Sequence, residues 1–369
     1  MSRRLLALSG FGVIGVVFHH AVHWVLTGMF WWTDRYILSA SVPDFSQLGS
    51  VSYWVIRGLD QFFVISVPIF LLTTGFFAAG TIGRVNAKHD WQTVFNRLRV
   101  LLIPYFIWTA VYVVMRYVLG ERFSPADLLS ILISGTATIP FYYVPLLVIL
   151  YLLAPFLVRM AKSHWQILLA IMLVCQVIVV VAAYQAFFTD IPGSSRVYAY
   201  LRGTHVFDLG LWFVLGIIIK LHLPSIKIFM ARIQPVLWPV TGVIAVVAIF
   251  EWEFIRRISG KEWIGTDLTV FDKIFALMLV MTILFHIKMV LPAPRQLGAL
   301  GSKIYGVYLS HMLILSIVAK LVYRFTPGLL AFPLAFWMIL GLLGMFVPLL
   351  TMRFMKVSPL RRYYVTIFG

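Results

Sequence analysis

Three histidines lie close together in the first apolar run of the chain, in VVFHHAVHW at residues 16–24. His19 and His23 are four residues apart and would share one face of a helix, and His20 lies between them. Ionisable groups inside a bilayer are costly, so each is a candidate for function. Three interpretations are open: structural histidines, ligands of a metal ion, or a general base that deprotonates an attacking hydroxyl.

A metal site at this cluster would need further ligands. A zinc site uses a third or fourth ligand at recognisable spacing, but the chain has one cysteine, Cys175, and no His-Glu-x-x-His pattern. We therefore expect no metal. The sequence also contains no Gly-x-Ser-x-Gly elbow, no P-loop and no dinucleotide-binding fingerprint within a βαβ unit.

A fourth histidine, His311, lies in GVYLSHMLIL, eight residues after Lys303. We expect it nearer the cytoplasmic face than His19, which would lie roughly 20 Å along a helix that begins near Leu5. On its own, a single buried histidine is more often structural than catalytic. The two imidazoles are predicted at different depths.

Arg97 and Arg99 lie in NRLRVLLIPYF, where an apolar run begins. Arginines in such a place anchor a cytoplasmic helix end by the positive-inside rule. A guanidinium also binds phosphate oxygens well. Two residues apart on a helix, the two side chains would diverge and flank a large anion rather than clamp one phosphate.

Further polar residues fall near the predicted outer ends of apolar runs. Arg202, His205 and Asp208 are spaced by three and would form one stripe on a helix. Such a stripe would be a polar lining for an acceptor or a simple interfacial band. We take His20, Tyr143, Arg202 and Asp208 as candidates for the acceptor side of a site.

The composition places these residues in a membrane protein. Of 369 residues, 62% are hydrophobic and 12% are charged, and the mean hydropathy is +0.96. Soluble domains carry about 25% charged residues. The net charge of +17 comes from short basic clusters between apolar runs, which argues against nucleic acid and for membrane orientation.

Apolar runs of about 20 residues predict transmembrane helices. We expect an all-α bundle of about ten spans in one domain over residues 1–369, with the first run an uncleaved span. The predicted spans are 5–30, 55–82, 100–119, 139–158, 165–187, 205–221, 235–255, 269–291, 304–325 and 329–351. Ser124 would cap a short helix over 124–134 at the outer interface.

Charge segregation supports ten spans with both termini in the cytoplasm. With that topology, eighteen basic residues and one acid, Asp90, fall on the inside. The other twelve basic and twelve acidic residues lie in outer loops or within spans and cancel one another. This bias is the one the positive-inside rule requires.

Several segments together resemble the acyltransferase 3 family of bacterial integral membrane acyltransferases. They are, in the order of that family, VVFHHAV, SVPIFLLTTGFF (66–77), RLRVLLIPYFIW (97–108), FYYVPLLVILYLLAP (141–155) and LGSKIYGVYLSHMLIL (300–315). Each motif is weak alone, but the ordered set covers nearly the whole chain. Leu8 and Thr74 stand where the family usually has arginine and serine.

The resemblance implies catalytic roles for His19 and His311, with Arg97 and Arg99 on the acyl-CoA side. It implies transfer of an acyl group, with acetyl as the expected group, from cytoplasmic acyl-CoA to a hydroxyl of a surface glycan or lipid-linked sugar. Such an enzyme lies in the bacterial cytoplasmic membrane and holds no permanent cofactor. The alternative is a transporter or flippase for a lipid-linked sugar, although no internal repeat indicates one.

Overall fold

Every described element of the chain is a helix. The computed structural model describes residues 1–35, 47–188, 194–260, 264–265, 268–286 and 293–369. The α-helices are α1 (Ser2–Arg35), α2 (Val51–Phe63), α3 (Ser66–Ala78), α4 (Ala87–Val118), α5 (Pro125–Ser134), α6 (Tyr143–Phe188), α7 (Ser194–Arg202), α8 (Val206–Leu221), α9 (Leu223–Ser259), α10 (Val270–Phe285), α11 (Pro294–Gly301), α12 (Ile304–Phe325), α13 (Pro333–Val357) and α14 (Tyr364–Phe368). Short 3-10 turns cover Ile139–Tyr142, Pro327–Ala331 and Pro359–Tyr363.

The predicted all-α, multi-pass bundle is confirmed. Within the described residues, eight helices are long and apolar enough to cross a membrane. The run predicted at 304–325 coincides with α12, and the helix expected at 124–134 is α5. Ser124 and Asp127 form a capping box there, and hydrogen bonds from Ser124 lower the pKa of the Asp127 carboxyl.

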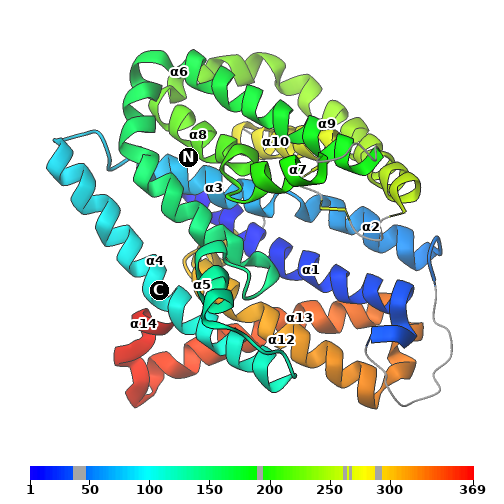
Figure 1. The fold of residues 1–369 in the computed structure, drawn as a ribbon. Helices are drawn as coiled ribbons and strands as arrows, with labels where there is room; N and C mark the ends of the chain where they lie inside the picture. The colour runs from blue at the N-terminus through cyan, green and yellow to red at the C-terminus, as the bar shows by residue number, and fades with distance from the viewer. Residues whose placement is uncertain (36–46, 189–193, 261–263, 266–267, 287–292) are drawn as a thin grey trace.

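The difference between eight candidates and ten predicted spans comes from two elements. The continuous helical segment Ile139–Phe188 contains two predicted spans, and His164 inside it has a non-helical backbone (φ −141°, ψ 48°). Figure 1 shows α6 bending sharply at the upper left. Helix α10 has 16 residues, and residues 287–291 of its predicted span lie outside the described residues. The count of ten stays a prediction.

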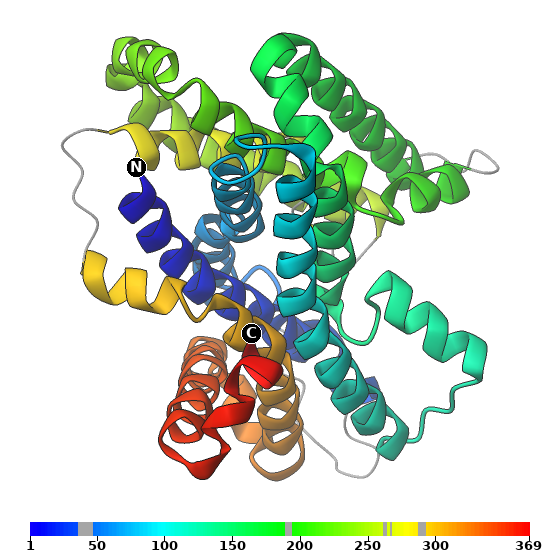
Figure 2. The same cartoon turned by 90° about the vertical axis from the view of Figure 1, so that its left-hand side faces the viewer.

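Helix α1 runs through the middle of the bundle. It contacts α2 and α3 on one side and α12 and α13 on the other, as Figure 1 shows. Both chain ends lie on the same side of the bundle, the side that faces the viewer in Figure 2. An even number of crossings requires this arrangement. The assignment of that side to the cytoplasm stays a prediction.

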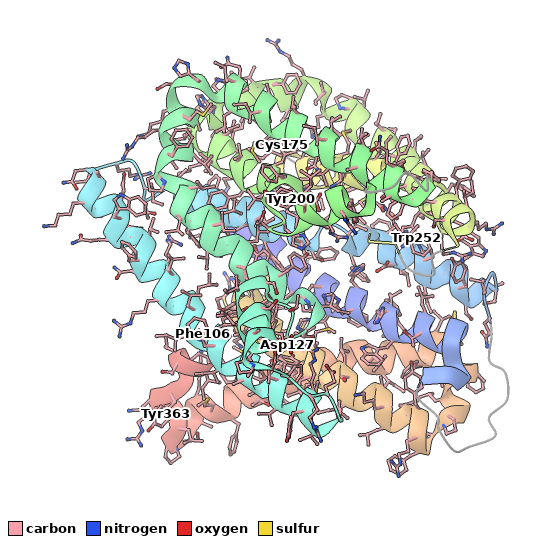
Figure 3. The ribbon with its side chains drawn as sticks, viewed as in Figure 1. Phe106, Asp127, Cys175, Tyr200, Trp252 and Tyr363 are labelled. Atoms are coloured by element: carbon pink, nitrogen blue, oxygen red, sulfur yellow. The ribbon has the colours of Figure 1, made fainter. Side chains whose placement is uncertain are left out.

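Apolar side chains cover the outside of the bundle. Phe106 on α4 is 47% exposed, and Figure 3 shows the outward side chains of the helices around it. Exposed aliphatic residues follow one another along α6, α9 and α13. A surface of this kind is stable when lipid chains cover it.

Two glycines allow α3 and α8 to approach within backbone contact. A Cβ atom on Gly75 of α3 would lie 2.0 Å from the carbonyl oxygen of Phe213, and one on Gly216 of α8 would lie 2.0 Å from that of Leu72. Lipid offers no hydrophobic drive for helix association, so close packing between small residues holds such pairs together. The α3–α8 contact positions one wall of the site described below.

We expect Gly216→Ala to lower the free energy of unfolding in detergent by about 1–3 kcal/mol, because the new methyl group overlaps the Leu72 carbonyl. Gly242→Ala on α9 is the matched control, since nothing lies within 4 Å of its added Cβ. Thermal unfolding of both purified variants checks this. Equal midpoints for the two variants would show that the α3–α8 contact tolerates a side chain.

Candidate active site

A cavity of about 180 Å³ lies at the centre of the bundle, among α1, α3, α6, α8, α10 and α12. Four of the residues singled out from the sequence line it: His19, His20, Tyr143 and Arg202. The rest of the lining is mainly apolar and aromatic. The cavity therefore offers a small number of polar groups inside an apolar enclosure, which is typical of a small-molecule site.

His19 is held by a carboxylate on the neighbouring helix. Its Nδ1 lies 2.6 Å from Oδ1 of Asp60, which is on α2 and has no exposed surface. The His19 side chain is 20% exposed, and it lines the cavity. A carboxylate on one ring nitrogen fixes the orientation of an imidazole and stabilises its protonated form. This pair therefore has the geometry of an oriented general base.

The same carboxylate also binds an arginine. Nη1 of Arg57 donates to Oδ2 of Asp60 at 3.0 Å, and Nη2 donates to Oε1 of Gln61 at 3.3 Å. The guanidinium lies 4.3 Å from the ring centroid of Trp252 on α9. Arg57 is 1% exposed. A fully buried cation is tolerated when a carboxylate and an aromatic face surround it.

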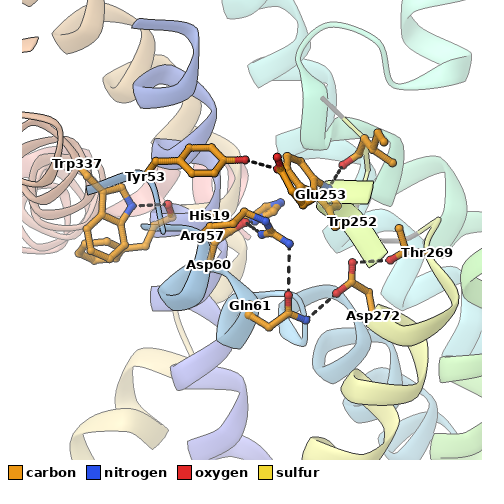
Figure 4. Close-up of polar contacts among 12 residues, drawn as sticks. His19, Tyr53, Arg57, Asp60, Gln61, Trp252, Glu253, Thr269, Asp272 and Trp337 are labelled. Carbon is orange, nitrogen blue, oxygen red and sulfur yellow. Dashed lines mark hydrogen bonds and ion pairs between the residues drawn. The ribbon is translucent and has the colours of Figure 1, made fainter. Parts of the chain in front are cut away.

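The network continues to α10, as Figure 4 shows. Nε2 of Gln61 donates to Oδ1 of Asp272 at 2.6 Å, and the Thr269 hydroxyl donates to the other oxygen of that carboxylate at 2.5 Å. Asp272 is fully buried and lines the cavity. A chain of polar contacts thus joins His19 on α1 to the opposite wall.

His20 and His311 lie next to one another. Their ring centroids are 5.4 Å apart, so the prediction of different depths is wrong. The reason is α11, which packs along the first turns of α1: a Cβ on Gly10 would lie 1.9 Å from the Leu297 carbonyl oxygen. Gly301, the last residue of α11, lies against Leu6 and Gly10 of α1, since a Cβ on it would be 2.4 Å from the Leu6 carbonyl oxygen. Helix α12 therefore begins about one to two turns along α1 rather than level with its first residue.

His311 is fully buried. Its Nδ1 contacts the carbonyl oxygen of Val307 at 3.0 Å, while Nε2 has no hydrogen-bond partner within the described part of the chain. The ring lies 6.4 Å from that of Tyr308, which lines the cavity. Tyr143 in turn lies 5.7 Å from Tyr308. His311 is thus behind the cavity wall rather than in it.

The two predicted donor-side arginines lie away from the cavity. Nη1 of Arg97 contacts the Tyr151 hydroxyl at 3.4 Å on α6, whereas Arg99 is exposed. Their environments differ, as expected for residues two apart on a helix. Tyr151 lies two turns along α6 from Tyr143, about 12 Å. Arg97 therefore lies near the cavity along α6 but does not line it.

The predicted stripe of Arg202, His205 and Asp208 is not one helix face. Helix α7 ends at Arg202, and His205 has a left-handed backbone (φ 54°) before α8 begins. Arg202 lines the cavity, but Asp208 is buried behind it and binds Nζ of Lys273 at 2.6 Å. Residues spaced by three share a helix face only where the helix is continuous, and here it is interrupted between Arg202 and Val206.

Sequence reasoning missed several residues of the site. Asp60 was recognisable as an acid near a span end, but Arg57 and Gln61 were not linked to it. The i,i+3 spacing of Arg57 and Asp60 in an apolar run was the available signal. Trp252 and Lys273 lie about 200 residues further along the chain, and no local pattern pairs them with α2. Among the described residues, no group of three or more His, Cys, Asp or Glu is placed to hold a metal ion.

Comparison with known protein families gives a match that covers nearly the whole chain. The sequence profile of a family described as an acyltransferase domain matches residues 7–353 of the 369. No curated protein and no solved structure gives a match. The matched range includes the cavity and every residue of its polar network. The chain therefore belongs to the acyltransferase 3 family and is a multi-pass membrane acyltransferase.

Proposed function

We propose that the protein is an O-acyltransferase of the bacterial cytoplasmic membrane that moves an acyl group from cytoplasmic acyl-CoA to a hydroxyl of a surface glycan or lipid-linked sugar. The observation that carries the proposal is the 2.6 Å contact between His19 and buried Asp60 in the wall of the cavity. The small volume of the cavity favours a short acyl group, and acetyl-CoA is the donor we propose.

In this mechanism, Asp60 binds Nδ1 of His19, and Nε2 takes the proton of the acceptor hydroxyl. The acceptor oxygen attacks the carbonyl carbon of the thioester. The carbon–sulfur bond then breaks, and the thiolate of CoA leaves and takes up the proton from His19. The ester product and free CoA balance the reaction without a permanent cofactor.

Arg57 has a supporting role in the same scheme. Its guanidinium balances the charge of Asp60 while His19 is neutral, and the imidazolium adds a second positive neighbour during the reaction. Because Asp60 uses one oxygen for each partner, neither contact has to break when His19 is protonated. We assign the second imidazole, His311, a role in positioning His20 at the cavity wall, at a ring distance of 5.4 Å.

His19→Ala should lower acyl transfer by about 10²–10⁴-fold, the usual contribution of a positioned base. Consumption of radiolabelled acetyl-CoA by the purified protein measures it. His23→Ala is the matched control, since His23 lies on the same helix and does not line the cavity. Full transfer by His19→Ala would refute the assignment.

Asp60→Asn should lower acyl transfer by about two to four orders of magnitude, because the amide no longer stabilises the imidazolium. It should also lower the free energy of unfolding by about 3–5 kcal/mol, since Arg57 is left as an uncompensated buried charge. Thermal unfolding and acetyl-CoA consumption measure the two effects.

The double variant Arg57→Met with Asp60→Asn separates stability from chemistry. Removing both charges should recover most of the lost stability, because no buried ion is left alone. Activity should stay low, because His19 still lacks its carboxylate. Recovery of activity together with stability would mean that Asp60 has a structural role only.

Arg97→Gln should raise KM for acetyl-CoA about tenfold with little change in kcat, the effect of losing one charge-assisted hydrogen bond to phosphate. Arg116→Gln is the control, since Arg116 lies at the other end of α4 and binds Glu121 at 2.7 Å. Steady-state kinetics over a range of donor concentration measure both. An unchanged KM in Arg97→Gln would place the donor elsewhere.

A further inference from the structure

A second hollow lies on the outer surface of the bundle, between α6, α8 and α10. It has a volume of about 370 Å³ and is lined mainly by aliphatic side chains, among them Val177, Leu215 and Leu277. We call it the apolar groove. Its helices carry exposed aliphatic residues on both sides of it, so its mouth faces the bilayer.

The apolar groove and the cavity share part of their walls. Trp212 of α8 and Lys273 of α10 line both. The Trp212 side chain is 4% exposed. A molecule in the groove is therefore separated from the cavity that His19 lines by two side chains.

The shared wall carries an ion pair. Nζ of Lys273 lies 2.6 Å from Oδ1 of Asp208, and Nε2 of Gln176 on α6 donates to the same oxygen at 3.2 Å. Charged groups at this position are costly within a bilayer and indicate function. An ammonium has three N–H donors, and Asp208 uses one of them, so Lys273 can bind a second anion without releasing the first.

The position of the pair indicates which substrate it serves. Asp208 and Lys273 lie in the first turns of α8 and α10, the ends that the charge pattern assigns to the outer side. Arg97, at the proposed donor end, lies near the start of α4 on the side assigned to the cytoplasm. The apolar groove is thus open to an acceptor in the membrane, and neither donor arginine lines it.

We propose that the apolar groove holds the hydrocarbon chain of a lipid-linked acceptor whose phosphate binds Lys273 and whose sugar hydroxyl reaches the cavity at His19. This inference rests on the proposed function and narrows its acceptor. The order of environments along the path, from apolar groove to cation to polar cavity, matches an amphiphile with a chain, a phosphate and a sugar. Lipid chains are as apolar as the groove, so Lys273 has to supply the selectivity.

The test uses the full-length protein in phosphatidylcholine vesicles with farnesyl phosphate that carries a photoreactive diazirine in its chain. Farnesol with the same diazirine is the comparison probe. We expect the phosphate probe to label peptides of α6, α8 and α10 at least about tenfold more than farnesol, because it adds a charge-assisted contact. Mass spectrometry of the labelled peptides gives the positions.

Two substitutions on adjacent residues of α6 locate the bound chain. Val177→Trp fills the apolar groove and should abolish labelling, whereas Ile178→Trp, 49% exposed in the native chain and outside the groove, should leave it unchanged. Lys273→Gln should reduce labelling about tenfold, and Lys273→Arg should retain it. Lys273→Gln combined with Asp208→Asn removes both charges, so loss of labelling there does not come from an unpaired buried acid.

Equal labelling by farnesol and farnesyl phosphate, or unchanged labelling in Lys273→Gln, would overturn the inference and indicate ordinary lipid contact. Protection by palmitoyl-CoA but not by farnesyl phosphate would also overturn it, because the groove would then hold the donor chain. Consumption of acetyl-CoA by the wild-type protein is measured separately. Failure there would contradict the proposed function while the labelling result stands independently.

Discussion

Asp60 is a carboxylate with no exposed surface in a bundle that lies in lipid, and this constraint organises the site. A buried carboxylate must be paired and hydrogen-bonded, because its desolvation is otherwise too costly. Asp60 meets the requirement with one oxygen on His19 and the other on Arg57. The first contact fixes α2 against α1. The second contact involves Arg57, whose buried guanidinium needs compensating partners in turn.

Because Arg57 is buried too, it needs partners of its own, and these connect it to α9 and α10. Its guanidinium lies over Trp252 of α9, and through Gln61 it is linked to Asp272 of α10. Helix α9 is largely exposed along its length, but Trp252, near its C-terminal end, belongs to this network. Helix α2 therefore carries the polar contacts, while α3, which follows after the break at residues 64–65, makes the glycine contact with α8. The span predicted at 55–82 thus consists of two helices with different contacts.

Much of the fold was predictable from local pattern, and the site only in part. Apolar length and basic clusters are local properties, so α12 was predicted at its observed bounds. His19 was recognisable because an imidazole in an apolar helix is costly wherever it lies. The depth of His311 was not, because it depends on α11 packing against Gly10, a contact between segments almost 300 residues apart. The environment of Arg57 was unpredictable for the same reason, since its partner Trp252 is brought to it only by the folded arrangement of α2 and α9.

In the proposed reaction, the placement of His19 also bears on how a donor and an acceptor from opposite faces of the membrane can meet. An acceptor hydroxyl is a poor nucleophile, and water at high concentration would compete with it for the thioester. A small cavity with mainly apolar walls limits that competition and strengthens every electrostatic contact inside it. The charges that must stay ionised, Asp60 and Arg57, lie behind the wall, where they neutralise one another. His19 connects this buried pair to the cavity, so the proposed chemistry would take place inside the mainly apolar enclosure without leaving an unpaired ion in lipid.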